Sequence, residues 1–195
     1  MGTVSACDTD RKTRLADAAI RIVGDEGLRS LTHRAADAAA GLPPGTCSYH
    51  FGTRSELLTA VLHRIATLDQ ADFDAALGGR QLSEMDIDEV VDGAVTVLTL
   101  WLGPARTRSR ARLLLSLDPQ VRQLAEPTVQ TLATMFQHLA VQLTGDAGTA
   151  RLLMAFVDGL VLDELIRADA PADAERLRFA IHALATTVIP VAPPS

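Results

Sequence analysis

The sequence predicts an all-α fold of about nine helices, and three observations lead to that prediction. Alanine and leucine are abundant, alternating β-branched runs are scarce, and apolar residues recur at spacings of three and four. Of the 195 residues, 48 % are hydrophobic but only 4 % are aromatic, so the core must consist mostly of Leu, Ala and Val. A chain of this length can bury a substantial core, as one domain or as a small domain joined to a larger one.

The first helix is expected at residues 11–26, after a tail from Met1 to Asp10 that has no core-forming pattern. Gly27 suits the position that follows a helix end. One face of this helix is apolar, and its members are Leu15, Ala18, Ala19, Ile22 and Val23.

Two short helices, at about 33–40 and 44–50, are expected on either side of the turn Gly41-Leu42-Pro43-Pro44. Thr32 is a side-chain cap for the first of them, Gly41 ends it, and Pro44 fits the first turn of the second. We expect Asp37, among the alanines of the first helix, to face solvent or to form an ion pair. The second helix is too short to be stable alone, and a short polar helix held rigidly at a surface is what a DNA major groove admits.

The remaining helices are expected at about 55–77, from Asp86 or Asp88 to 102, at 105–117, through Val121 to Leu143, at 149–168 and at 172–189. Glycine and proline mark the ends between them, at Gly78-Gly79, Gly103-Pro104 and Asp118-Pro119.

The net charge of −6 is unevenly distributed along the chain. Residues 11–64 contain eight basic residues against five acidic ones, a net charge of +3, so the remainder is acidic. A positive head on a negative body would orient the protein on DNA. No apolar run reaches the roughly 18 residues that span a bilayer, and the first ten residues lack the centre of a signal peptide, so we expect no membrane partner and a cytoplasmic location.

No constellation for catalysis or metal binding stands out. Asp158, Asp163 and Glu164 lie on one late helix, but the sequence contains no nucleophile–base pattern, glycine-rich phosphate loop or metal-ligand spacing. We therefore predict no catalytic residues, no metal and no cofactor. Cys7 and Cys47 form no CxxC pair, and a redox role for them stays open.

Matched residues over about the first 65 positions give a resemblance to the TetR family of transcriptional regulators. They are Gly27, Leu31-Thr32, Ala40-Gly41-Leu42, Gly45-Thr46, Tyr49-His50-Phe51, Thr53-Arg54 and Glu56-Leu57-Leu58. Many members of that family carry alanine, tyrosine and lysine where Asp37, Ser48 and Arg54 stand here.

The resemblance implies a three-helix DNA-binding head, residues 11–54, after the tail 1–10, and a ligand-binding and dimerisation body, residues 55–195. It implies a ligand-responsive regulator, expected to be a repressor, that binds a pseudo-palindromic operator in double-stranded DNA as a homodimer and is released by a small-molecule effector. Carried over by position, the residues expected at base edges are Arg34, Pro44, Gly45, Thr46 and Ser48. Those expected at phosphates are Thr32, Tyr49, His50 and Arg54.

The dimer is implied through the last two helices, with interface candidates Leu153, Phe156, Val157, Gly159, Leu160, Leu177, Ile181 and Leu184. The residues alone equally allow these helices to pack on their own body. Large apolar side chains and a few polar ones are candidates for the effector pocket: Phe73, Trp101, Met135, Phe136, His138, Met154 and Asp158. Two alternatives stay open: a helical dimer that acts through protein contacts without recognising DNA, and a small-molecule-processing enzyme.

Overall fold

The computed structural model describes residues 6–81, 84–124, 137–138, 140–167 and 172–188. The described residues are helical with turns and loops between, and none of them lies in a strand, so the predicted all-α fold is confirmed. In order along the chain the helices are α1 (Ala6–Glu26), the 3₁₀ helix η1 (Leu28–Ser30), α2 (His33–Ala40), α3 (Thr46–His50), α4 (Arg54–Leu77), α5 (Ile87–Leu102), α6 (Arg106–Leu117), α7 (Pro119–Leu124), α9 (Ala147–Arg167) and α10 (Ala174–Val188).

Two helix starts predicted in the first 50 residues are wrong. Helix α1 begins at Ala6 rather than 11, and Asp8 in its first turn is favourable there because a carboxylate complements the positive end of the helix dipole. Helix α3 begins at Thr46 rather than 44, because Gly45 has φ 90°, outside the right-handed helical region, and so precedes the helix as its N-cap. The predicted helix from Val121 to Leu143 lies largely outside the described residues.

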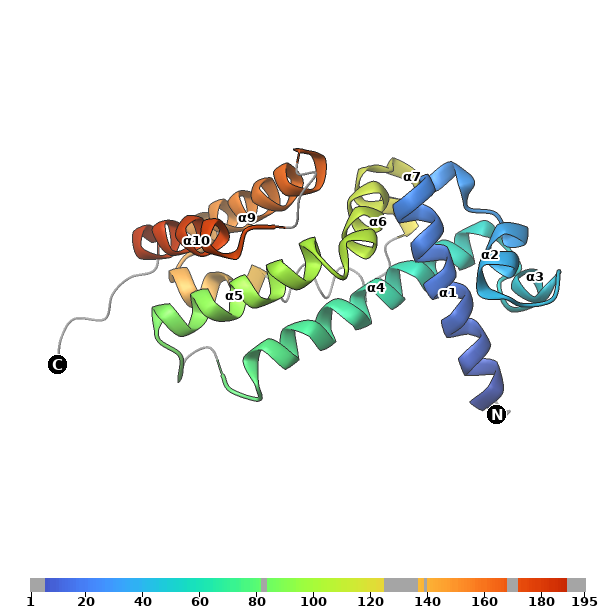
Figure 1. Cartoon of the computed structure of the whole chain (residues 1–195), viewed down its shortest axis with the longest axis horizontal. Coiled ribbons are helices and arrows are strands. Elements are labelled where there is room, and N and C mark those ends of the chain that lie inside the picture. The colour runs from blue at the N-terminus through green and yellow to red at the C-terminus, as the bar shows by residue number, and fades with distance from the viewer. Residues whose placement is uncertain (1–5, 82–83, 125–136, 139, 168–171, 189–195) are drawn as a thin grey trace. The chain divides into compact units, whose positions relative to one another are not determined.

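The described residues form two compact units, one containing residues 6–68 and 107–124 and the other the remaining described residues. We call them the first and second unit. Figure 1 shows α1, α2 and α3 at the blue end of the chain, where α1 packs against both α2 and α3. The core of the first unit gathers apolar side chains from these helices and from α4, α6 and α7.

Helix α1 approaches α6 closely within the first unit, at Gly24. A Cβ atom at this position would overlap the carbonyl oxygen of Thr107, and the Thr107 hydroxyl donates a hydrogen bond to Asp25 at 2.9 Å. Any side chain at position 24 would therefore push the two helices apart.

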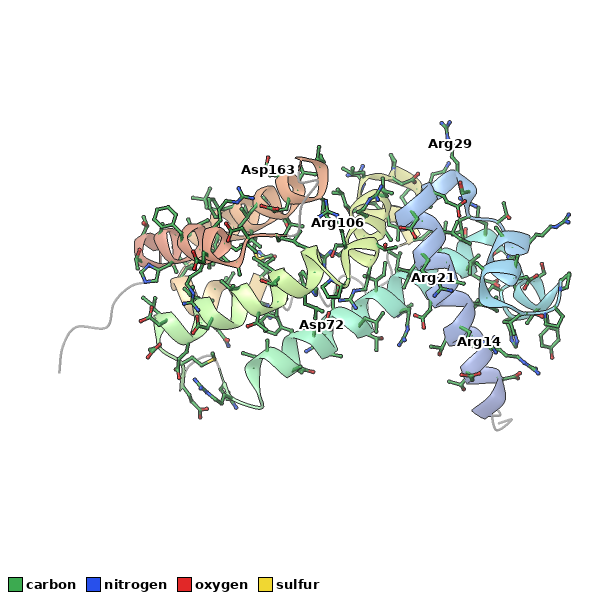
Figure 2. All side chains as sticks on the ribbon, in the orientation of Figure 1. Arg14, Arg21, Arg29, Asp72, Arg106 and Asp163 are labelled. Atoms are coloured by element: carbon green, nitrogen blue, oxygen red, sulfur yellow. The ribbon has the colours of Figure 1, made fainter. Side chains whose placement is uncertain are left out.

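The second unit is built around α5 and α10, which pack side by side with α9 against both (Figure 1). Its core contains Val91, Leu98 and Trp101 from α5 and Leu177 and Ile181 from α10. Helix α5 begins with a capping box, because Asp86 and Glu89 each bond the other's backbone N–H. At the start of α6, Arg106 (labelled in Figure 2) donates to the carbonyl oxygen of Glu164 on α9 at 2.9 Å.

Candidate nucleic-acid interface and effector region

Helix α2 begins and ends where the sequence predicts. The Thr32 hydroxyl accepts a hydrogen bond from the Ala35 N–H at 3.0 Å, and Gly41 closes the helix in the left-handed region with φ 62°. The last carbonyl groups of α2 accept hydrogen bonds from α1: Arg14 donates to Ala40 O at 2.8 Å and Arg21 donates to Ala39 O at 3.1 Å. Figure 2 labels both arginines along α1. Both ends of α2 are thus fixed by side-chain hydrogen bonds.

Asp37 is buried, contrary to the sequence prediction. Its side chain is 3 % exposed, and its two carboxylate oxygens accept hydrogen bonds from the backbone N–H groups of Gly45, at 2.8 Å, and Cys47, at 2.7 Å. Burial is tolerated because the charge is met by donors at the positive end of a helix. The helix propensity of an alanine-rich segment does not predict such a contact, because the two partners of Asp37 lie eight and ten residues further along the chain.

The nine predicted DNA-contact residues lie together in the segment from Thr32 to the start of α4. Thr46 and His50 are half-buried, and the other seven are exposed: Thr32, Arg34, Pro44, Gly45, Ser48, Tyr49 and Arg54. Tyr49 is 81 % exposed, and its ring meets that of His50 edge to face at 5.1 Å between centroids. An aromatic side chain left so open at the end of a short helix is available to a partner.

Arg54 has an internal role as well. Its guanidinium donates to the carbonyl oxygen of Leu28 at 2.7 Å and also to that of Leu31. The start of α4 is further stabilised by Thr53, which accepts from the Glu56 N–H, and by Glu56, which accepts from the Gly52 N–H. These bonds join η1 to the start of α4, on either side of the α2–turn–α3 segment.

A hollow of about 540 Å³ opens beside α3, and the sequence analysis did not single out its residues from α1. Its lining combines charged side chains of α1, one acidic and two basic, with residues of the turn and of α3: Asp10, Arg11, Arg14, Leu42, Pro43, Gly45, Thr46, Tyr49 and His50. The signal available in the sequence was the basic start of the first helix, Arg11-Lys12-Thr13-Arg14. These basic residues could be assigned to the hollow only once the structure showed that α1 lies beside the turn.

Cys47 is fully buried in α3 and is a free thiol. Burial, and secondarily the nearby Asp37 carboxylate, raise its pKa to about 11. The thiol is therefore protonated near neutral pH and is a poor nucleophile. The side chain of Cys7 lies outside what the structure describes.

In the second unit the structure brings together two of the predicted pocket residues, Trp101 and Phe73, in one apolar cluster. The indole N–H of Trp101 donates to the Asp72 carboxylate at 2.9 Å, and Asp72 is labelled on α4 in Figure 2. Asp72 was missed by the sequence analysis. Met154 is half-buried and His138 and Asp158 are exposed, while Met135 and Phe136 lie outside the described residues.

The eight predicted interface residues differ in burial. Leu177 and Ile181 are only 0 % and 7 % exposed and face the core around α5, so they pack within their own chain. Val157 and Leu160 are half-buried against the same core, Leu153 and Leu184 are half-buried, and Phe156 and Gly159 are exposed. Other large apolar side chains on these helices are exposed and were not predicted: Leu152, Leu162 and Ile166 on α9 and Phe179 on α10.

The described residues offer neither a metal site nor a membrane-spanning helix. They contain no group of three or more His, Cys, Asp or Glu side chains arranged to hold a metal ion. None of their helices is long and apolar enough to cross a membrane.

A capped helix, a tight turn and a short polar helix, stabilised by a third helix behind them, define a helix-turn-helix protein. The family described as "Tetracyclin repressor-like, C-terminal domain" matches residues 85–187. The chain therefore belongs to the TetR family of transcriptional regulators.

Relatives with known names agree with that assignment. The HTH-type transcriptional regulator BetI of Rhizobium meliloti is 31 % identical over 67 residues, which are 34 % of this chain and about a third (33 %) of that protein. A TetR-family member from Streptomyces coelicolor is 34 % identical, with 93 % of this chain and 99 % of the other covered and a TM-score of 0.71. The multidrug binding protein EbrR, complexed with imidazole, is 34 % identical, with 94 % and 97 % covered and a TM-score of 0.68. EbrR has also been solved with ethidium and with malachite green.

Proposed function

We propose that this protein is a ligand-responsive transcriptional regulator, acting as a repressor, that binds a pseudo-palindromic DNA operator as a homodimer and is released by a small molecule. The observation that carries the proposal is the α2–turn–α3 segment, in which a short helix is held by its neighbours and keeps its polar face exposed. Residues 11–54 would supply the DNA contacts, and residues 55–195 the effector and dimer contacts.

We assign base contacts to Arg34 on α2 and to the turn and first part of α3. Arg34 is exposed, so its guanidinium is available for a bidentate contact to guanine. Thr46 and Ser48 suit single hydrogen bonds, and Pro44 and Gly45 allow the backbone to approach the bases. Because these side chains are short, part of the specificity would come from DNA shape.

Phosphate contacts would surround this region. Thr32, Tyr49 and His50 have polar groups suited to phosphate oxygens, and Arg54 adds positive charge at the start of α4. Arg11, Lys12 and Arg14 at the start of α1 extend the positive charge, and two of them line the hollow beside α3. Arg14 and Arg54 would contribute mainly through charge, because their guanidinium groups already bond backbone carbonyls.

We propose the dimer interface on the outer faces of α9 and α10. Ile166 is 70 % exposed and Phe179 is 77 % exposed, alongside Leu152 and Phe156. Covering such a surface with a second copy would bury it. Binding to two half-sites one DNA turn apart would require the two α3 helices to lie about 34–36 Å apart. The interface would use the predicted Phe156 and Gly159, with Leu177 and Ile181 supporting it from within.

For the effector we propose a flat aromatic cation that binds near Trp101, Phe73 and Asp72. The support is the Asp72 carboxylate bonded to the Trp101 indole, the packing of Phe73 against the apolar cluster that contains Trp101, and the ethidium and malachite green complexes of EbrR, both organic cations. A ring face and a carboxylate together favour such a ligand. Release requires the ligand to bind the DNA-free state more tightly than the DNA-bound state, with a coupling of about 1–3 kcal/mol.

The test is a gel-shift titration of the full chain with DNA from upstream of its own gene, against scrambled DNA, at several salt concentrations. Arg34→Ala should weaken selective binding by about tenfold or more, since a bidentate base contact is worth roughly 1–3 kcal/mol. Arg29→Ala is the matched control, because it removes another exposed arginine, from η1, outside the predicted contacts. Absence of any salt-sensitive, selective binding by the wild-type protein would refute DNA recognition and favour action through protein contacts.

The effector is tested with ethidium as the probe. Binding should raise the melting temperature of the wild-type protein and weaken its DNA complex, and Asp72→Asn should reduce both effects. Ethidium binding that leaves DNA affinity unchanged would refute the inducer role.

A further inference from the structure

Helix α3 has no cap of its own. It contains five residues, and its N-cap is Gly45, which has no side chain to accept hydrogen bonds from the first N–H groups. The Thr46 hydroxyl is directed away from them, because it donates to Pro43 O at 2.7 Å. A helix this short cannot maintain itself by its internal hydrogen bonds, so its position must be imposed by contacts from outside.

The cap comes from the preceding helix. The Asp37 carboxylate on α2 accepts the Gly45 N–H with one oxygen and the Cys47 N–H with the other, which fixes both the distance and the rotation of α3 relative to α2. A charged acceptor makes each of these bonds stronger than a neutral one would. Burial of Asp37 and Cys47 keeps water from competing for the Cys47 N–H.

We propose that Asp37 is a positioning residue for DNA recognition. It holds α3 at the distance from α2 and at the rotation at which the exposed side chains of α3 meet base edges. A second consequence concerns phosphate. Since the carboxylate already occupies the amides of Gly45 and Cys47, the start of α3 is closed to DNA phosphates, and these are bound by side chains elsewhere on the first unit. This inference rests on the proposed function, because it assigns α3 to the DNA bases.

The experiment compares Asp37→Asn with the wild type in the full chain. Asparagine keeps the shape of the side chain but turns an NH₂ group toward one of the two N–H donors. The preference for operator over scrambled DNA should fall about tenfold to a hundredfold, the loss expected when a hydrogen bond to a charged group is removed. The slope of log affinity against log salt concentration should stay unchanged, because the phosphate contacts do not involve these amides.

Glu26→Gln is the matched control. It removes one negative charge from the same unit, at an exposed position at the end of α1, and should leave the operator preference at the wild-type value. An equal loss of preference in both variants would mean that charge, rather than the position of α3, carries the effect, and would overturn the proposal.

Thiol labelling gives a second measurement that needs no DNA. In a Cys7→Ser background, a thiol reagent reaches the buried Cys47 only when α3 opens, so Asp37→Asn should accelerate labelling by about tenfold or more. Dimer mass and helix content should stay at the values of the Cys7→Ser protein. This separates local release of α3 from general loss of folding.

The outcomes are distinguishable. An Asp37→Asn protein with the wild-type operator preference and the wild-type labelling rate overturns the positioning role. A wild-type protein that shows no selective DNA binding overturns the proposed function instead, and the labelling rates then still decide whether Asp37 holds α3 in place.

Discussion

The surface around α3 and the outer surface of α9 and α10 differ in what they leave exposed. Around α3 the exposed side chains are mainly polar, and the helix ends beneath them are bonded by Asp37, Arg14, Arg21 and Arg54. On α9 and α10 the exposed groups include large apolar side chains, such as Ile166 and Phe179. A surface that meets bases and phosphates needs fixed polar groups, whereas a surface that meets a copy of itself gains most from apolar area.

The largest effect is expected from making the α9–α10 surface polar. Ile166→Asp together with Phe179→Asp should raise the dimer dissociation constant by more than about a hundredfold, because each large apolar side chain contributes roughly 1.5–3 kcal/mol when buried. Analytical ultracentrifugation measures this constant. Leu117→Asp, at an exposed apolar position of α6, is the control and should leave the dimer intact. If the double variant stays dimeric at nanomolar concentration, the exposed apolar side chains of α9 and α10 do not form the dimer interface.

The next effect separates a core position on α10 from an exposed position on the neighbouring helix α9. Leu177→Ala should lower the free energy of unfolding by roughly 2–5 kcal/mol, because Leu177 is fully buried in the core around α5. Urea denaturation measures the loss. Leu152→Ala, on the exposed face of α9, is the matched control and should change the stability of the protomer little. If Leu177→Ala dissociates the dimer but leaves the free energy of unfolding unchanged, Leu177 belongs to the dimer interface and not to the core.

A pH dependence is expected from Cys47 in the first unit. Its pKa is about 11 in the folded protein against 9.0 for an ordinary thiol, so the folded state binds this proton more tightly than the unfolded state. The contribution is fully present below pH 9 and is lost as pH rises toward 11, by up to about 1.4 kcal/mol per pH unit. Unfolding of the wild type and of Cys47→Ala between pH 8 and 11 measures the difference. Parallel curves for the two proteins would show that the thiol does not stay protonated in the folded state.

The smallest effect is expected at the cap of α2. Thr32→Ala should cost about 1 kcal/mol of unfolding free energy, because it removes the acceptor for the Ala35 N–H. Thr32→Ser keeps the hydroxyl and should lose much less. A full loss with serine would show that the methyl group, rather than the cap, stabilises the start of α2.

The sequence by itself determined the features that depend on neighbouring residues. The cap at Thr32 and the helix end at Gly41 follow from local chemistry, which also narrowed the start of α5 to Asp86 or Asp88, of which Asp86 is the cap. The resemblance over the first 65 residues placed the helix-turn-helix segment. Amphipathic spacing located α4, α5 and α6 to within a few residues, because side chains three and four apart share one helix face.

Only the tertiary structure decided which face meets which partner. It showed that Asp37 caps another helix, that Asp72 bonds Trp101, and that Leu177 and Ile181 are core residues while Phe179 is exposed. The physical reason is that these outcomes depend on contacts between residues distant in the chain. The periodicity of one helix shows that an apolar face exists, but it carries no information on what covers that face.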